Sequence, residues 1–529
     1  MREIKELREF NEGTVLLRQK KFCDAERLFE SVLEAQPNHF DALHLLGTIA
    51  RETGRPERAV ELIQKAVDLN PQSPTAHKDL AVAQMDIERP FDALASCDRA
   101  ITLDATYAEA YRVRGNALLH LKFAQIALTS LDTAIALEPT LASAHHSRGI
   151  ALLALDRPEE TLASCERALA LMPNLAEAHD TAGSAQLMQH GFVEALEKYD
   201  DAIFLDPCLA RAHFNKALCL LQMGRLEEGL REYEWRKKLR QPIGLRSYSQ
   251  AFWSGEESLV GTTLFIYWEQ GLGDTIQFYR YAKLAAARGA RIVMSVQDSL
   301  VNLLKETNPE IQIIRSNETP EDFDCHCPLL SLPFAFRTTL ATIPTERSYI
   351  AVDQGLRAAW SDRLAPSTRP RIGVVWSGGK RHANDQNRSI PLERLFPLFS
   401  ADADWICLQT ELTAKDVGLV RKYGDISFYG DEVKDFADTA ALIDLMDLVI
   451  TVDTGVAHLA GAMGKPVWIL LPYNSDWRWL HDRDDSPWYP SVKLYRQQQP
   501  GNWEPVISQI KNDLRAANPW KPGRGPIAS

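Results

Sequence analysis

The residues best suited to chemistry lie in segment 445–472, LMDLVITVDTGVAHLAGAMGKPVWILLP. Asp453, Thr454 and Gly455 follow a short apolar run, and His458 lies in the Ala-rich stretch after them. If that stretch is a helix, the free N–H groups of its first turn and its dipole favour a bound phosphate. Gly455 would let such a ligand approach the backbone closely. The alternative is an ordinary strand-to-helix turn in which Asp453 is the N-cap.

The elements that must position this turn are also visible in the sequence. Leu448 to Val452 is rich in β-branched residues, which is typical of a strand buried on both faces of a parallel sheet. Val456 to Met463 predicts a helix that Gly464 ends. Val467 to Leu471 predicts a second buried strand, so the unit is strand, tight turn, helix and strand.

The first 240 residues repeat with a period of 34. Small or turn-forming residues recur at this spacing, namely Pro37, Pro71, Ala105, Pro139, Pro173 and Pro207, and Ala42, Ala76, Ala110, Ala144, Ala178 and Ala212. This pattern resembles the tetratricopeptide repeat (TPR), in which stacked helical hairpins form a superhelical solenoid. About seven repeats are expected, the last ending near Leu239. The resemblance implies a groove that holds a protein segment, and a dimerisation or spacer module is the alternative.

The second half alternates strands and helices after a linker at 241–260. The expected elements are a strand at Thr263–Trp268, a turn at 271–274, a helix at Ile276–Arg288, a strand at Ala290–Val296, a strand at Ile372–Trp376, a polar loop at Ser377–Ser389, a helix at Leu392–Phe399, a strand at Trp405–Gln409 and a terminal helix at Val506–Ala517. This predicts two Rossmann-like domains, 261–365 and 366–529, joined by a Pro-containing stretch at 356–370. Ligands of such folds lie outside the carboxyl ends of the strands, so a cleft between the domains is expected.

A solenoid followed by two such domains resembles bacterial TPR glycosyltransferases. The second half is similar to the heptosyltransferase type, glycosyltransferase family 9, of the GT-B fold, and more loosely to protein O-GlcNAc transferases. Two motifs carry the resemblance: Gly271-Leu272-Gly273-Asp274, and Asp453-Thr454-Gly455 with His458-Leu459-Ala460. The expected fold is therefore an all-α TPR solenoid followed by an α/β GT-B region.

The resemblance implies that Asp274 is the general base that takes the proton of an acceptor hydroxyl. Gly271 and Gly273 would form the turn before it. The alternative for Asp274 is a helix N-cap. Glu269 is the reserve candidate for the base.

On the donor side, the resemblance assigns sugar hydroxyls to Asp453 and phosphates to Thr454, Gly455 and His458. The polar loop that begins at Ser377 concentrates cations and small residues, which suits the charge of a leaving phosphate. Lys380 corresponds to a donor-contacting lysine of heptosyltransferases, but the loop is longer here. The choice between Lys380 and Arg388 therefore stays open, with a solvated surface loop as the alternative. A cluster that includes Asp476-Trp477-Arg478-Trp479 is expected to line the donor pocket or the mouth of the cleft.

The expected activity is an inverting, metal-independent transfer of a sugar from a nucleotide sugar to a hydroxyl group. The acceptor would be a protein or peptide held in the TPR groove, and no cofactor beyond the donor substrate is expected. One alternative is a non-catalytic TPR scaffold with a degenerate transferase domain. Another is a dinucleotide oxidoreductase, since Gly271 and Gly273 begin a G-x-G-x-x-G pattern, but Ile276 stands at its third glycine position.

Composition excludes several other classes. The net charge of −12 does not favour a nucleic-acid partner. No apolar run approaches the ~20 residues of a membrane span, and the charged N-terminus MREIKELREF is unlike a signal peptide. Eight scattered cysteines indicate a reducing, cytoplasmic protein. Cys325-His326-Cys327 lacks a second ligand pair nearby, so no metal site is expected.

Overall fold

The structure is a computed structural model that describes residues 2–240, 244–364, 366–379, 384–400 and 402–517. The chain divides into two compact units, residues 1–215 and 216–529, and each is described by itself. The domain limits expected from the sequence stay predictions. None of the helices formed by the described residues is long and apolar enough to cross a membrane.

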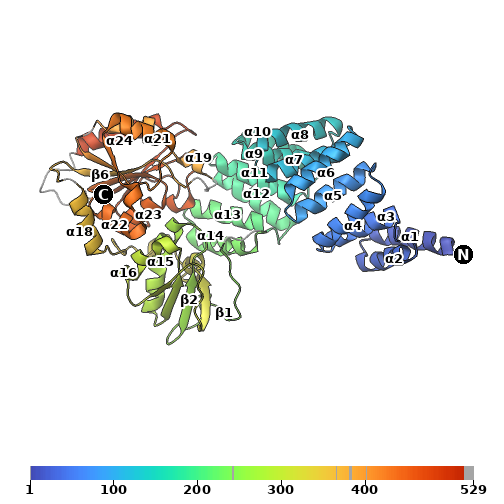
Figure 1. Cartoon of the computed structure of the whole chain (residues 1–529), viewed down its shortest axis with the longest axis horizontal. Coiled ribbons are helices and arrows are strands. Elements are labelled where there is room, and N and C mark those ends of the chain that lie inside the picture. The colour runs from blue at the N-terminus through green and yellow to red at the C-terminus, as the bar shows by residue number, and fades with distance from the viewer. Residues whose placement is uncertain (1, 241–243, 365, 380–383, 401, 518–529) are drawn as a thin grey trace. The chain divides into compact units, whose positions relative to one another are not determined.

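The first unit is a solenoid of successive helical hairpins (Figure 1). Its helices are α1 (Arg2–Arg18), α2 (Phe22–Ala35), α3 (Phe40–Glu52), α4 (Pro56–Leu69), α5 (Pro74–Asp86), α6 (Pro90–Leu103), α7 (Ala108–His120), α8 (Ala124–Leu137), α9 (Ala142–Ala154), α10 (Pro158–Leu171), α11 (Ala176–Met188) and α12 (Phe192–Leu205). In chain order, α13 (Ala210–Gln222) and α14 (Leu226–Tyr233) supply a seventh hairpin. The predicted TPR solenoid is confirmed.

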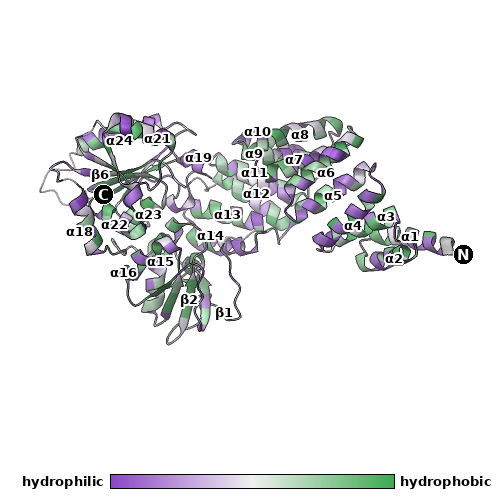
Figure 2. Cartoon of the chain, viewed as in Figure 1, coloured by the Kyte–Doolittle hydropathy of each residue, from purple (hydrophilic) through white to green (hydrophobic). Residues whose placement is uncertain are grey.

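Small residues let the two helices of a hairpin pack closely. A β-carbon added to Gly115 would lie 2.6 Å from Leu131 Cγ, and one added to Gly183 would lie 2.7 Å from Tyr199 Cε1. The recurring alanines of the 34-residue period are buried, and in Figure 2 the helices carry both hydrophobic and hydrophilic faces. The period therefore marks the helix crossings, where any larger side chain would overlap its neighbour.

The second unit contains two sheets whose described strands all pair in parallel. The first sheet has the order β1-β5-β2-β3-β4 and the second the order β11-β10-β9-β6-β7-β8. The strands are β1 (Ala251–Phe252), β2 (Thr263–Tyr267), β3 (Arg291–Ser295), β4 (Gln312–Ile314), β5 (Cys325–Pro328), β6 (Arg371–Val375), β7 (Asp404–Cys407), β8 (Ile426–Phe428), β9 (Leu448–Val452), β10 (Val467–Leu471) and β11 (Val492–Arg496).

Helices cover the faces of both sheets, as parallel strands require. They are α15 (Leu272–Ala287), α16 (Val301–Thr307), α17 (Leu332–Ala335), α18 (Gln354–Arg363), α19 (Asp385–Arg388), α20 (Leu392–Leu395), α21 (Ala414–Tyr423), α22 (Phe436–Asp444), α23 (Gly455–Ala462) and α24 (Glu504–Ala517), with 3-10 helices η1 (Glu234–Lys238) and η7 (Trp477–Trp479) among the shorter elements. Figure 1 places α21 and α24 on one face of the second sheet and α22 and α23 on the other. The predicted α/β character is confirmed.

Three segments differ from the sequence-based expectation. Residues 272–274, expected in a turn, form the first turn of α15, which has Gly271 as its N-cap. The stretch 356–370 is not a plain connection, because α18 occupies much of it and buries Trp360, whose Nε1 donates to Asp438 Oδ1 at 2.9 Å. The helix expected at 392–399 is the short α20, and Pro397 then lies in a 3-10 turn, Phe396–Leu398. Proline has no N–H group to continue an α-helix, which explains the early end.

Candidate functional site

The strand order of each sheet has one switch point, where the direction of the chain across the sheet reverses. In the second sheet the chain runs outward from β6 through β7 to β8, then crosses back to β9 on the other side of β6. In the first sheet β3 and β4 lie on one side of β2 and β5 on the other. Such switch points hold ligands in open α/β sheets. The loops after β6, β9 and β2 are the segments that the sequence marked for chemistry.

The turn after β9 leads directly into α23. Thr454 is the N-cap, with φ −145° and ψ 171°, so the alternative in which Asp453 caps the helix is wrong. Within the described residues, the Thr454 side chain makes no capping hydrogen bond, and its hydroxyl pairs with that of Thr451 at 3.2 Å. The N–H groups of the first turn have no partner inside a helix. The turn from Thr454 to Gly455 is therefore built as an anion site requires.

Asp453 and His458 are held close together, and burial disfavours the charged form of each side chain. His458 Nε2 lies 3.9 Å from Asp453 Oδ1, and His458 Nδ1 shares a 2.9 Å hydrogen bond with the Tyr489 hydroxyl. The imidazole stacks on Trp479 at 5.1 Å between ring centroids. Burial lowers the pKa of His458 to about 3. Burial and the charge of Asp476 raise the pKa of Asp453 to about 6.

The loop after β6 is organised by Gln409, which follows β7. Gln409 Oε1 accepts hydrogen bonds from the N–H groups of Trp376 and Ser377, and Gln409 Nε2 donates to Ser377 Oγ at 3.0 Å. Arg388 Nη1 donates to the Asp453 carbonyl oxygen at 2.9 Å, which joins this loop to the turn after β9. Lys380 lies outside the described residues. Arg388 is thus placed beside the candidate phosphate turn, and Gln409 holds Ser377 at the start of the same loop.

The turn after β2, in the first sheet domain, faces α23, in the second sheet domain. Asp274 Oδ2 accepts the N–H of Gly271 at 2.6 Å at the start of α15. A β-carbon on Gly273 would lie 2.6 Å from His458 Cδ2, and one on Gly455 would lie 3.8 Å from the Gly273 nitrogen. The first turns of α15 and α23 are therefore in close contact, and Asp274 is brought to the donor side of the site.

Arg478, on η7, connects the two motifs. Its Nη2 lies 2.5 Å from Asp274 Oδ1, and its Nη1 donates to Asp476 Oδ1 at 2.8 Å. Its side chain is only 7% exposed, and the two carboxylates raise its pKa further above the usual value. Sequence reasoning marked the segment around Arg478 as lining the cleft, but did not predict its pairing with Asp274.

Glu269, the reserve candidate for the base, is engaged elsewhere. Arg236 donates to both of its carboxylate oxygens, at 3.1 and 2.8 Å, and the Leu330 N–H donates at 3.1 Å. Glu269 is 2% exposed. These contacts are those of a buried structural ion pair that attaches η1 to the first sheet domain.

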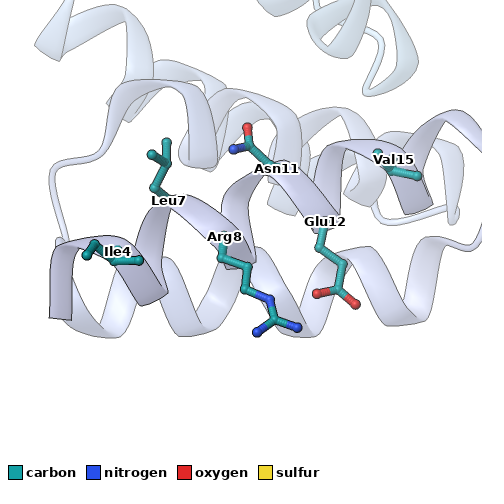
Figure 3. A pocket seen from close by; sticks show the side chains of 6 residues that line it. All are labelled: Ile4, Leu7, Arg8, Asn11, Glu12 and Val15. Carbon is teal, nitrogen blue, oxygen red and sulfur yellow. The ribbon is translucent and has the colours of Figure 1, made fainter. Parts of the chain in front are cut away.

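Two surface pockets lie away from these residues. One, of about 510 Å³, is on α1 and is lined by Ile4, Leu7, Arg8, Asn11, Glu12 and Val15 (Figure 3). The other, of about 440 Å³, is lined by Gly255, Glu256, Arg288, Ala335, Phe336 and Arg337. Within the described ranges, no cluster of three or more His, Cys, Asp or Glu side chains is arranged to hold a metal. The expected independence from metal and cofactor stays a prediction.

Comparison with known families supports both halves of this description. Residues 10–74 match the Tetratricopeptide repeat family, and residues 434–479 match Glycosyltransferase family 9 (heptosyltransferase). The chain thus has a segment similar to family 9 after residues that match the TPR family. The family 9 match contains β9, the Asp453 turn, His458 and Arg478, whereas Asp274 and Arg388 lie outside it.

Individual relatives match only part of the chain. Protein FlbA of Caulobacter vibrioides is 27% identical over 323 residues, which are 56% of this chain and 53% of FlbA, so the match spans about half of that relative. Among solved structures, MamA is 26% identical over 33% of this chain and 94% of its own, with a TM-score of 0.29. TTC0263, a TPR protein of Thermus thermophilus, is 25% identical over 34% of this chain and 99% of its own, with a TM-score of 0.32.

Proposed function

We propose that this protein is a GT-B glycosyltransferase that moves a sugar from a nucleotide-activated donor to a hydroxyl group of a protein. The observation that carries the proposal is the approach of two switch-point turns: Asp274, from the first sheet domain, meets the family 9 segment around Asp453 and His458. A carboxylate on one side and an anion-binding helix start on the other are the two parts that such a transfer needs.

The donor side supplies neutral and cationic hydrogen-bond donors. The N–H groups of Thr454 and Gly455 would bind the phosphate at the positive end of the α23 dipole. The depressed pKa of His458 keeps its ring neutral, so it would act by hydrogen bonding and not as a cation. Arg388, tied to the Asp453 carbonyl, places a permanent positive charge beside the same turn.

The reaction would be a single displacement. Asp274 accepts the proton of the acceptor hydroxyl, the oxygen attacks the anomeric carbon, and the bond from that carbon to the phosphate oxygen breaks. Attack from the face opposite the leaving phosphate inverts the anomeric centre. The cations and N–H groups stabilise the negative charge that develops on the phosphate, which is the task a metal performs in other transferases, and the transfer is accordingly proposed to be metal-independent.

The solenoid would recruit the acceptor. Stacked TPR hairpins present a continuous surface that is suited to an extended protein segment. The eight cysteines, all described, are free thiols, which agrees with a reducing cytoplasmic setting for the proposed reaction.

Intact mass spectrometry tests the proposal. Proteins from cells with and without this chain are compared, and the purified full chain is incubated with candidate acceptors and a panel of nucleotide sugars. The expected result is that an acceptor protein gains the mass of one sugar residue, and that this gain occurs only when the active chain is present. Absence of any added mass, together with no release of nucleotide from any donor, would contradict the assignment.

A further inference from the structure

Arg478 is a buried cation whose hydrogen-bonding capacity is only partly used. Within the described part of the chain, its Nε has no hydrogen-bond acceptor, and its Nη2 is paired with the Asp274 carboxylate. A guanidinium group has five N–H donors, and buried polar groups are normally satisfied. A buried arginine with donors to spare, only 7% exposed, is therefore suited to an anionic ligand.

The surroundings of Arg478 place that ligand at the donor turn. Its positive charge acts on both Asp453 and His458, which flank the first turn of α23. Asp476 fixes the backbone of η7, because its Oδ1 accepts the Arg478 N–H at 2.9 Å as well as the Nη1 contact. Asp476 can thus hold the arginine in place while the opposite edge of the guanidinium changes partners.

We propose that Arg478 binds the phosphate of the activated sugar and in doing so releases Asp274, so that arrival of the donor frees the carboxylate to accept the proton of the acceptor. This inference rests on the transfer reaction proposed above. Without donor, Arg478 and Asp274 neutralise one another. A phosphate oxygen competes for the guanidinium because charge-assisted, bidentate contacts to phosphate are among the strongest hydrogen bonds in proteins. Donor would therefore bind before acceptor.

The competing explanation is that Arg478 is a structural clamp between the two sheet domains. A clamp would affect stability but would not respond to an anion. Isothermal titration of the full-length chain with inorganic pyrophosphate separates the phosphate-binding role from the clamp role, because it measures the response to an anion. It needs neither the natural donor nor catalysis. Thermal melting of each variant shows whether it is folded.

The titration compares five variants. Arg478→Met is expected to weaken pyrophosphate binding about tenfold or more, and Arg478→Lys to an intermediate extent, since lysine keeps the charge but not the planar fork. Asp274→Asn is expected to tighten binding several-fold, because Arg478 is no longer shared. The double variant D274N/R478M should bind as weakly as R478M alone. Arg357→Met, which removes the ion pair between Arg357 on α18 and Asp444 on α22, is the matched control and should bind like the wild type.

Each contrary outcome overturns the inference. Pyrophosphate binding that is equal in R478M and wild type, or undetectable in the wild type at millimolar concentration, removes Arg478 from phosphate binding. If D274N still tightens pyrophosphate binding when R478M is also present, the Asp274 carboxylate only repels the anion directly and does not compete with it for Arg478. If the expected pattern is found but no sugar transfer occurs with any donor, the anion site stands and the proposed function fails.

Discussion

Gly273 and His458 touch across the two sheet domains, and a β-carbon at position 273 would lie 2.6 Å from His458 Cδ2. His458 has no room to retreat, because Trp479 stacks on its ring and Tyr489 bonds its Nδ1. The contact sets how closely the first turn of α15 approaches the first turn of α23.

Replacement of Gly273 by alanine is expected to push these turns apart. We expect a loss of about 1–3 kcal/mol in the free energy of unfolding, typical of overpacking, and a larger loss of transfer activity, since small misplacements of reacting groups are costly. Chemical denaturation and initial rates measure the two effects. Gly418→Ala is the control, because nothing lies within 4 Å of the added carbon. Unchanged activity in G273A would show that the approach is not needed.

His458 predicts a pH dependence of stability. Its pKa is lowered to about 3 in the folded chain, against about 6.5 when unfolded. Between these pKa values the unfolded state binds a proton that the folded state excludes. The stability that neutral His458 contributes to the folded state is therefore present above pH 7 and is lost as the pH falls. The loss is about 3 kcal/mol at pH 4.5. Denaturation of His458→Gln across this range should show a shallower acid slope than the wild type; parallel slopes would refute the buried neutral imidazole.

Asp453 makes the opposite contribution. Its pKa is raised to about 6, so between pH 4 and 6 the folded state retains a proton that the unfolded state has lost. Stability from this group is present below pH 4 and is lost as the pH rises through 6, by about 3 kcal/mol. Asp453→Asn should therefore gain stability relative to the wild type as the pH rises from 4 to 7. A constant difference between the two proteins would show that the carboxyl group is not perturbed.

Asp274→Asn is expected to lower sugar transfer by about 100- to 10,000-fold, the range for loss of a general base. Nucleotide binding should not weaken, because the amide keeps the shape of the side chain and removes a negative charge from the anion site. Asp298→Asn is the matched control, since Asp298 is an exposed partner of Arg315. Rates that stay equal to wild type in D274N would remove Asp274 from the chemistry.

The repeats can be removed in two ways that have different expected outcomes. A chain that starts at residue 208 keeps α13, α14 and η1, and should lose transfer to protein while retaining hydrolysis of the donor. A chain that starts at residue 241 also removes Arg236 and leaves Glu269 buried without its ion-pair partner. Breaking such a pair costs about 3–5 kcal/mol, so this second chain should melt at a lower temperature. Equal loss of protein transfer and donor hydrolysis in the first chain would make the repeats merely structural.

The sequence predicts those parts of the molecule whose signal is local. The 34-residue period and the turn from Asp453 to His458 are each contained in one or two consecutive elements, so periodicity and turn chemistry suffice to predict them. The contact of Arg478 with Asp274 joins residues about 200 positions apart, and no spacing rule encodes it. Gln409 holds the loop after β6 because β7 pairs with β6. That pairing depends on the order of the strands in the sheet, which local sequence patterns do not give.

The stretch before Pro370 illustrates a second limit. Its proline and polar residues indicate a connection, yet α18 forms there because Trp360 finds a buried partner in Asp438. A tertiary contact of this kind overrides local propensity. The same reasoning explains why Glu269 was an attractive alternative base: its carboxylate lies at the correct end of β2, and only the fold reveals that Arg236 and Leu330 occupy it.

The parallel pairing of the described strands has a consequence for how this protein can change over evolution. Each sheet presents its strand-to-helix loops at one edge, while the strands themselves carry the hydrophobic core. Under the proposed function, mutations in the loop after β6 would change which sugar is accepted, and mutations after β2 would change which acceptor is used, without disturbing the folding of either sheet. Under that function, the preference for the sugar and the preference for the acceptor can change independently during evolution of the same fold.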